Sequence, residues 1–527
     1  MSSMAASLAT GRQRERRLIW MACGVTAVAV LATLLVGIRL SSPAVPSPLP
    51  AMRHPGALAI MPFQPITADP DTSHFGIGLA DSMVNRLARV PGLTVRPMSA
   101  TLALAGGITD PAEVGRRVGA SAVMAGHFRQ DGDHLEVTAQ LVDVQTGFTS
   151  WGHSTETRLT DLAQVEHEVT EEALSVLLPG FDRTAQAPQP SSPGDPAAHH
   201  LYVLARGKMA SLLSGVVLES VQLLEQAVAR DPESAAAHAA LAEASLNMFL
   251  AGHSADTLWI DRAVAAGRRA VRLDEQDPAA HLALGYALLF SGDPVGTMRE
   301  TVRALQVDAE MPGAHRMLGM LLAGAGLSAP ARAARQRAQA LDPSMELGWL
   351  DVHIAIAAGT LSETTEALER EVERRAAAGL PAEIPVFNLG YLAFERDDAA
   401  SGLHWAAMLE NVSESPQYAD IVRLLALARA GDGEGASRIL QKHGSALQKD
   451  WEYSQWVGRA LALLGRREEA LEWLERSARM GCYQVHALEA SDAVDGLRAD
   501  PRFQRLLAQV RGRARAIVQQ AEFAGYL

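Results

Sequence analysis

The sequence predicts a single transmembrane helix, then a small α/β domain, then an all-α solenoid of helical repeats. Three observations predict this architecture. The segment Leu18 to Ile38 carries no charged residue. The next part of the chain alternates short apolar runs with helix-like stretches and contains a hairpin signal at Asp131-Gly132-Asp133. In the second half, an aliphatic-Asp pair recurs every 34 residues, at Leu273-Asp274, Val307-Asp308 and Leu341-Asp342.

The composition limits the classes of function. A chain of 527 residues exceeds the size of one hydrophobic core and should divide into domains. An aromatic fraction of only 5% favours Ala-rich helices over a β-sandwich. The net charge of −13 argues against direct nucleic-acid binding, which needs a basic face. The two cysteines, Cys23 and Cys482, lie far apart, and we expect no structural disulfide.

The apolar segment at residues 18–38 has the length of a membrane-spanning helix. The preceding tail, residues 1–17, is basic, with Arg12, Arg14, Arg16 and Arg17. The positive-inside rule therefore places the N-terminus in the cytoplasm and the rest of the chain in the periplasm, anchored in a bacterial inner membrane. The alternative is a cleaved signal peptide with Ser42-Pro43-Ala44 as its cleavage site, although signal peptides use shorter apolar regions of about 7–15 residues.

A proline-rich linker at residues 39–55 leads to the predicted α/β domain, residues 56–180. Asp110 before Pro111 is typical of a helix start, and Thr160 is the predicted cap of the closing helix. The predicted helices are 75–90, 111–118 and 160–177, and the predicted strands are 57–63, 93–97, 121–130, 134–144 and 148–155.

Several motifs of this domain occur in order and resemble the TolB-like amino-terminal domain of bacterial signalling proteins. They include Ile60-Met61-Pro62-Phe63, Gly78-Leu79-Ala80-Asp81, Gly126-His127-Phe128-Arg129 and Thr146-Gly147-Phe148. The resemblance implies an exported domain that follows one transmembrane helix and precedes tetratricopeptide repeats. In CadC-like transcriptional regulators the cytoplasmic end carries a winged-helix DNA-binding domain, and in others a cyclase or kinase domain. Only 17 residues precede the apolar segment here, so we expect no such domain in this chain.

A second linker, residues 181–198, is rich in Pro and Ser and precedes the repeat array, residues 199–515, and a tail, residues 516–527. The 34-residue period also relates Leu284-Gly285 to Leu318-Gly319, and Ala304 to Ala338. This spacing is typical of tetratricopeptide repeats, in which small residues let two helices approach closely. A nine-residue insertion is expected within Ala251 to Asp261, and a C-terminal cap around residues 495–503.

Such an array presents a concave surface, and its register predicts a groove that binds a protein or peptide partner. The predicted groove is largely apolar and aromatic, which suits a peptide with hydrophobic anchors. The alternative is that the aromatic residues pack between repeats; helical spacing leaves both open. The groove positions are Leu282, Tyr286, Phe290, Arg316, Met320, Leu350, Ile354, Phe387, Tyr391, Phe394 and Arg459.

No arrangement of residues in the sequence predicts catalysis, a metal site or a cofactor site. His167-Glu168 lacks the second His of a helical zinc motif, and Gly76-x-Gly78 lacks a phosphate-binding Lys. The sequence thus predicts a non-enzymatic, membrane-anchored interaction protein, a scaffold or sensor. The alternative is a transcriptional regulator of the CadC-like type, or a partner or truncated form of one, that signals across the membrane.

Overall fold

The computed structural model describes most of the chain from residue 56 onward. The described residues are 56–66, 70–90, 92–102, 104, 108–179, 193–209, 214–250, 257–342, 345, 348–378, 382–413, 416–448 and 450–527. The predicted membrane helix, the 39–55 linker and most of the 181–198 linker lie outside them. Within the described ranges, no helix has both the length and the apolar character needed to cross a bilayer.

A mixed sheet forms the centre of the α/β domain. Its strands β1 (Leu58–Ile60), β3 (Ala122–Asp131), β4 (His134–Asp143) and β5 (Thr149–Arg158) are adjacent in that order, and β2 (Gln64–Pro65) also pairs with β3. β1 and β2 run parallel to β3, whereas β3, β4 and β5 are antiparallel. The predicted hairpin is confirmed: Asp131 pairs with His134, and Gly132 between them has a φ of 60°.

The sheet is accompanied by α2 (Pro70–Leu87), α3 (Met98–Leu102), α4 (Pro111–Val118) and α5 (Leu162–Leu177). The predicted start of α4 is confirmed, since the Asp110 carboxylate accepts a hydrogen bond from the backbone N–H of Ala112. The predicted strand at 93–97 is wrong. Val95 forms only an isolated bridge with Leu58, because Pro97 has no N–H to donate and α3 begins directly after it. Thr160 is not a cap and lies inside the short helix η1 (Leu159–Asp161).

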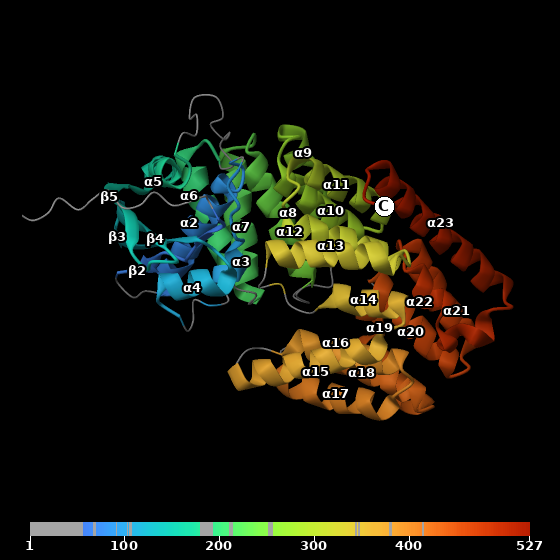
Figure 1. Ribbon diagram of the computed structural model, residues 1–527. Helices are drawn as coiled ribbons and strands as arrows, with labels where there is room; N and C mark the ends of the chain where they lie inside the picture. Colours follow the sequence, from blue (N-terminus) through green and yellow to red (C-terminus); the bar gives the residue numbers. More distant parts are fainter. Residues whose placement is uncertain are drawn as a thin grey trace, which may run out of the picture. The chain divides into compact units, whose positions relative to one another are not determined.

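Paired helices make up the repeat region (Figure 1). In each pair the first helix is called helix A and the second helix B. The pairs are α6 (Pro196–Met209) with α7 (Ser214–Arg230), α8 (Ala235–Leu250) with α9 (Leu258–Leu273), α10 (Pro278–Phe290) with α11 (Pro294–Val307), α12 (Pro312–Gly324) with α13 (Ser328–Leu341), α14 (Trp349–Ala358) with α15 (Leu361–Ala378), α16 (Glu383–Glu395) with α17 (Ala399–Val412), α18 (Pro416–Arg429) with α19 (Gly433–Leu447), and α20 (Trp451–Leu463) with α21 (Arg467–Arg479).

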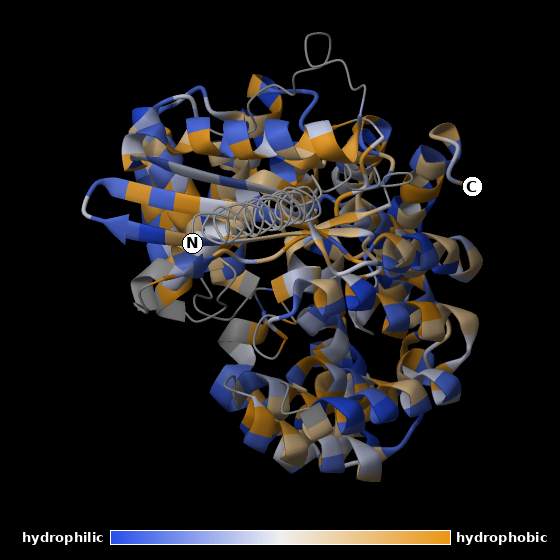
Figure 2. Ribbon diagram, turned by 60° about the vertical axis from the view of Figure 1, so that its left-hand side comes forward, coloured by the Kyte–Doolittle hydropathy of each residue, from blue (hydrophilic) through white to orange (hydrophobic). Residues whose placement is uncertain are grey.

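The 34-residue period corresponds to one helix pair, as predicted. Ala304 of α11 and Ala338 of α13 occupy equivalent positions and both are fully buried. Apolar and polar residues alternate along the helices, as expected for amphipathic helices that bury one side (Figure 2). The predicted insertion is shorter than expected on its C-terminal side, because Leu258 to Asp261 already belong to α9.

The C-terminal segment consists of α22 (Val485–Glu489), η2 (Asp492–Leu497) and α23 (Pro501–Phe523). The predicted boundary between the repeat array and the tail, at residue 516, falls inside α23. Ile517 and Ala521 continue the buried side of α23 and are fully buried, so the helix extends through Phe523.

The α/β domain contacts the repeats directly. α2 packs on α6 at two glycines, since a Cβ on Gly78 would collide with the backbone of Val203 and a Cβ on Gly207 with that of His74. Further along the array, the Arg89 guanidinium lies 2.9 Å from the Asp277 carboxylate. These contacts fix the α/β domain against the first repeats.

Candidate functional site

The inward side of α10 and α12 is the accessible part of the predicted groove. Leu282, Tyr286, Phe290 and Met320 are half-buried, and Arg316 is exposed. The Arg316 guanidinium donates a hydrogen bond to the Tyr286 hydroxyl, with the two atoms 2.6 Å apart, and lies 5.8 Å from the centre of the Tyr286 ring. These five predicted residues therefore form a surface, called here the α10–α12 surface.

The α10–α12 surface combines apolar area with a cation. Phe290 packs at a tilt against Phe249 of α8, with their ring centres 6.2 Å apart, which extends the apolar area toward the preceding repeat. Arg316 is exposed and donates one N–H to the Tyr286 hydroxyl, so its remaining N–H groups can bind a partner. An aromatic residue and an Arg that share one face are the residue types that dominate binding energies at protein interfaces.

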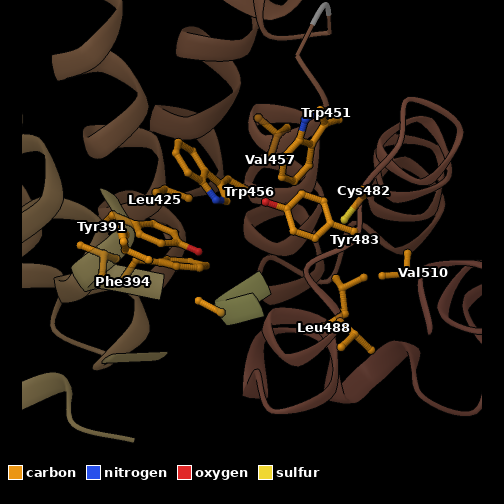
Figure 3. Close-up of a cluster of buried hydrophobic side chains, with 14 of the residues drawn as sticks. Tyr391, Phe394, Leu425, Trp451, Trp456, Val457, Cys482, Tyr483, Leu488 and Val510 are labelled. Carbon is orange, nitrogen blue, oxygen red and sulfur yellow. The ribbon is translucent and has the colours of Figure 1, made fainter. Parts of the chain in front are cut away.

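The same side of the later repeats is closed. The other six predicted groove residues are buried among side chains of the chain itself, namely Leu350, Ile354, Phe387, Tyr391, Phe394 and Arg459. An aromatic cluster of Trp349, Phe387, Tyr391 and Trp456 fills the space between α14, α16 and α20. The ring centres of Tyr391 and Trp456 are 4.7 Å apart, and those of Trp349 and Trp456 are 5.3 Å apart. Figure 3 shows Tyr391, Phe394 and Trp456 among the buried side chains of this region.

Arg459 lies at the base of the aromatic cluster and is fully buried. Its guanidinium makes two hydrogen bonds of 2.7 Å to the Glu395 carboxylate, and it also donates to the hydroxyls of Tyr391 and Ser491. Burial alone would raise the pKa of Glu395, but the neighbouring Arg459 charge holds that pKa below its ordinary value. Arg459 thus acts as an internal ion-pair partner, with no N–H directed at an open groove.

The repeat register changes at α14, which the constant 34-residue spacing did not predict. Leu350 packs toward Gly319 of α12, where a Cβ would lie 3.1 Å from the Leu350 side chain. Trp349 and His353 contact each other. Trp349 packs on Trp456 of the aromatic cluster, and His353 lies beside Gln484. These two residues therefore take the inward positions that the period predicted for Leu350 and Ile354.

Sequence reasoning also missed the segment that closes the later repeats. Gly481 and Gly292 approach so closely that a Cβ on either would collide with the backbone of the other segment. Gln484 donates to the Glu452 carboxylate at 2.6 Å and lies 3.2 Å from the His353 ring nitrogen. The positive φ values of Gly292 and Gly481, 90° and 102°, are the local reason for glycine there. The only local signal in the sequence is the pair of glycines themselves, Gly292 and Gly481.

The pKa of the Asp450 carboxyl group is shifted from its ordinary value, and the structure explains why. Burial, followed by the charge of Glu452, raises the pKa of Asp450 to about 7. Its carboxylate accepts hydrogen bonds from the backbone N–H groups of Glu452 and Tyr453 and so caps α20. Among the residues that the structure describes, no group of three or more His, Cys, Asp or Glu side chains is placed to hold a metal ion.

Sequence comparison finds similarity to two groups of known proteins. Residues 54–171 match a family described as the second domain of HilA/YgeH-like transcriptional regulators. The matched residues are the α/β domain, which sequence reasoning compared with TolB-like domains; the TolB-like and CadC-like assignments stay predictions. A Rhizobium meliloti (strain 1021) protein named "Putative adenylate cyclase 3" is 27% identical over 245 residues, 46% of this chain. The match covers 41% of that relative, so the chain spans less than half of its length.

Solved structures of helical-repeat proteins share low similarity with this chain. Yeast Tom70 has a TM-score of 0.34 and 12% identity, covering 84% of this chain and 85% of its own. The tetratricopeptide domain of P58(IPK) has a TM-score of 0.19 and 15% identity, covering 62% of this chain and 97% of its own. These scores are too low to define a common overall arrangement. The chain's own period and helix pairs define it as a helical-repeat protein of tetratricopeptide type.

Proposed function

We propose that this chain is a non-enzymatic interaction protein, a membrane-anchored scaffold or sensor, whose α10–α12 surface binds a protein partner. The accessible Tyr286–Arg316 pair is the observation that carries the proposal. Tyr and Arg on a half-buried apolar surface provide the anchors that protein interfaces use most. A peptide with an apolar anchor and an acceptor group beside it would satisfy both halves of the surface.

A triple variant tests this binding surface: Tyr286→Ala, Arg316→Ala and Met320→Ala. Co-purification with the tagged full-length chain should lose its specific partner, while the melting temperature changes little because these residues are only half-buried or exposed. Arg303→Ala on α11 is the matched control, since Arg303 is exposed and donates a hydrogen bond to Gln306 of its own helix. Retention of the partner by the triple variant would overturn the proposal. Tyr391 is not used, because it is fully buried and bonded to Arg459.

The anchoring part of the proposal rests on residues 18–38 and the arginines before them. Alkaline phosphatase fused after Leu527 should be active in a Gram-negative host if the bulk of the chain is periplasmic. A fusion of normal abundance without activity would contradict this orientation. A size on gels equal to that of the whole chain would favour the anchor over a cleaved signal peptide.

A second candidate function is transcriptional regulation. The match of residues 54–171 to the second domain of HilA/YgeH-like regulators favours it. In that case this chain would act as the sensing part, or as the partner, of a protein with a DNA-binding domain. Inspection of the DNA directly upstream separates the two candidates, since an in-frame winged-helix sequence is expected only for the regulator.

A further inference from the structure

A cavity on α7, α8 and α9 involves none of the residues of the α10–α12 surface. It is open to solvent, with a volume of about 320 Å³. Its polar lining consists of Glu225, His238, Ser245, Arg262 and Arg269, and its apolar lining of Leu241, Ala265 and Ala266. A volume of this size is at the lower end of the range for small-molecule sites.

The next repeat shows how a carboxylate is held at the same place. The pairs Asp231-Pro232 and Asp274-Glu275 begin equivalent turns, so His238 of α8 corresponds to His281 of α10. In helix B the 34-residue period makes Ala266 of α9 the equivalent of Glu300 of α11.

His281 and His238 share one contact and differ in another. The Nε2 atom of each lies 3.1 Å from a backbone carbonyl oxygen six residues earlier, Glu275 for His281 and Pro232 for His238. The Nδ1 atom of His281 lies 2.8 Å from a Glu300 carboxylate oxygen. At His238 the corresponding position is Ala266, whose side chain is too short to reach the ring. The cavity is lined by both His238 and Ala266, the counterparts of His281 and Glu300.

The contact with the Pro232 carbonyl determines which proton His238 can donate. A carbonyl only accepts, so Nε2 must carry a hydrogen, and in the neutral ring Nδ1 is an acceptor. Only the protonated ring can donate from Nδ1 to a carboxylate. The groups that face the ring are Arg269 and Arg272 of α9 and Glu233 of the turn before α8; burial first, and then the two arginines, lower the pKa of His238.

The lining of the cavity carries more positive than negative charge. Arg262 lies 3.2 Å from Glu225, and Arg269 lies 2.5 Å from Glu233, each through one terminal nitrogen. Each guanidinium has five N–H donors, so both retain donors for a further acceptor. Three of these four charged residues line the cavity: Arg262, Arg269 and Glu225. Glu233 is not part of the lining.

We propose that this cavity binds a small organic carboxylate. Its carboxylate takes the place that Glu300 has beside His281, and receives hydrogen bonds from protonated His238 and from Arg262 or Arg269. Its short hydrocarbon part lies on Leu241, Ala265 and Ala266. Binding takes up a proton at His238, so the affinity increases as the pH falls toward 6.

Isothermal titration of the full-length chain with glutarate and with propionate tests the proposal. We expect one binding event per chain, stronger at pH 6 than at pH 8, with a heat that depends on the buffer because a proton is taken up. His238→Gln should weaken binding roughly tenfold to a hundredfold, the usual loss for a charged hydrogen bond. His315→Gln is the matched control, since His315 has the equivalent position in α12 and contacts the Ala309 carbonyl at 2.9 Å but does not line this cavity.

Two further variants keep the proposal falsifiable. Ala266→Glu installs the arrangement of the next repeat and should abolish glutarate binding. Glu300→Ala should create a second vacancy beside His281, and propionate should restore part of the melting temperature that this variant loses. The proposal is overturned if glutarate does not bind, if His238→Gln binds it equally well, or if the uncharged glutaramide binds as tightly as glutarate. Since the α10–α12 variants leave this cavity intact, its test is independent of the proposed partner binding.

Discussion

Two regions of the array are built from the same repeat motif but differ in how exposed their inward sides are. One is the inward side of α10 and α12, and the other is the inward side of α16 and α20. Tyr286 on α10 is half-buried and bonded to the exposed Arg316. Tyr391 on α16 is fully buried and bonded to Arg459, which is also fully buried. Each pair is a Tyr hydroxyl that accepts from an Arg, yet one forms a surface and the other a core.

The cause of this difference lies outside the repeat motif. Trp349 and Trp456 bring α14 and α20 together across the inward side, and Gln484 with Glu452 adds the C-terminal segment. At the earlier pair, Tyr483 packs against Gly324 at the end of α12, while Tyr286 and Met320 stay half-buried. A helical-repeat position is therefore a binding surface only where the rest of the chain leaves it uncovered.

The largest expected effect distinguishes the two Tyr–Arg pairs. Arg459→Ala should lower the free energy of unfolding by about 3–5 kcal/mol, because it leaves the Glu395 carboxylate buried without its partner. Arg316→Ala should cost less than about 1 kcal/mol, because its charge is exposed. Urea unfolding of both variants measures the contrast. Equal losses would mean that the later repeats are as open as the earlier ones.

The second-largest loss of stability is expected from overpacking the contact between helix A and helix B. Ala304→Trp and Ala338→Trp insert a large side chain where helix A meets helix B, at fully buried positions, and should cost about 1–3 kcal/mol or more. The exposed Ala333 of α13 is the matched control, and Ala333→Trp should be close to neutral. Melting temperatures that stay at the wild-type value for both buried variants would refute the helix-packing role of the period.

The closure of the later repeats can be tested at one glycine. Gly481→Ala should destabilise the protein by roughly 1–3 kcal/mol, since it combines a left-handed backbone with a collision at Gly292. Gly465→Ala is the control: it has a φ of 71° but no neighbour within 4 Å, so only the backbone strain of about 1 kcal/mol applies. Thermal unfolding should rank Gly481→Ala below Gly465→Ala; the reverse order would show that the Gly292–Gly481 contact does not hold the array closed.

The fold could be predicted from the sequence where local signals act alone. The Asp110 cap, the Gly132 hairpin and the position of Ala304 depend on neighbours in the chain, and each was correct. The groove could be predicted only in part. Phe387 and Tyr391 have groove spacing, but their burial depends on Trp456, which lies more than sixty residues later. Periodicity places a residue on a face of its helix and does not state what covers that face.

The smallest expected effect is a pH-dependent difference in stability between substitutions of His281 and His315, which occupy equivalent positions in successive repeats. Burial opposes protonation of His281, but the Glu300 carboxylate raises its pKa above the ordinary value of 6.5, and the pKa of Glu300 is lowered in turn. This pair therefore stabilises the fold fully between pH 4.5 and 6.5, and the His281 contribution is lost as the pH rises through its folded pKa. Among the described residues no carboxylate hydrogen-bonds to His315. Burial lowers its pKa, although the nearby Asp308 charge opposes the shift, so its contribution is present above pH 6.5 and lost as the pH falls.

Stability measured at two pH values should therefore change in opposite directions for the two substitutions. Relative to wild type, His281→Gln should cost on the order of 1 kcal/mol at pH 6 and less at pH 8. His315→Gln should be less destabilising at pH 5.5 than at pH 8, because the substitution removes a group that favours unfolding at low pH. Parallel pH profiles for the two variants would show that Glu300 does not distinguish the two repeats. The opposite profiles would establish, from stability alone, that a carboxylate beside this histidine changes its protonation.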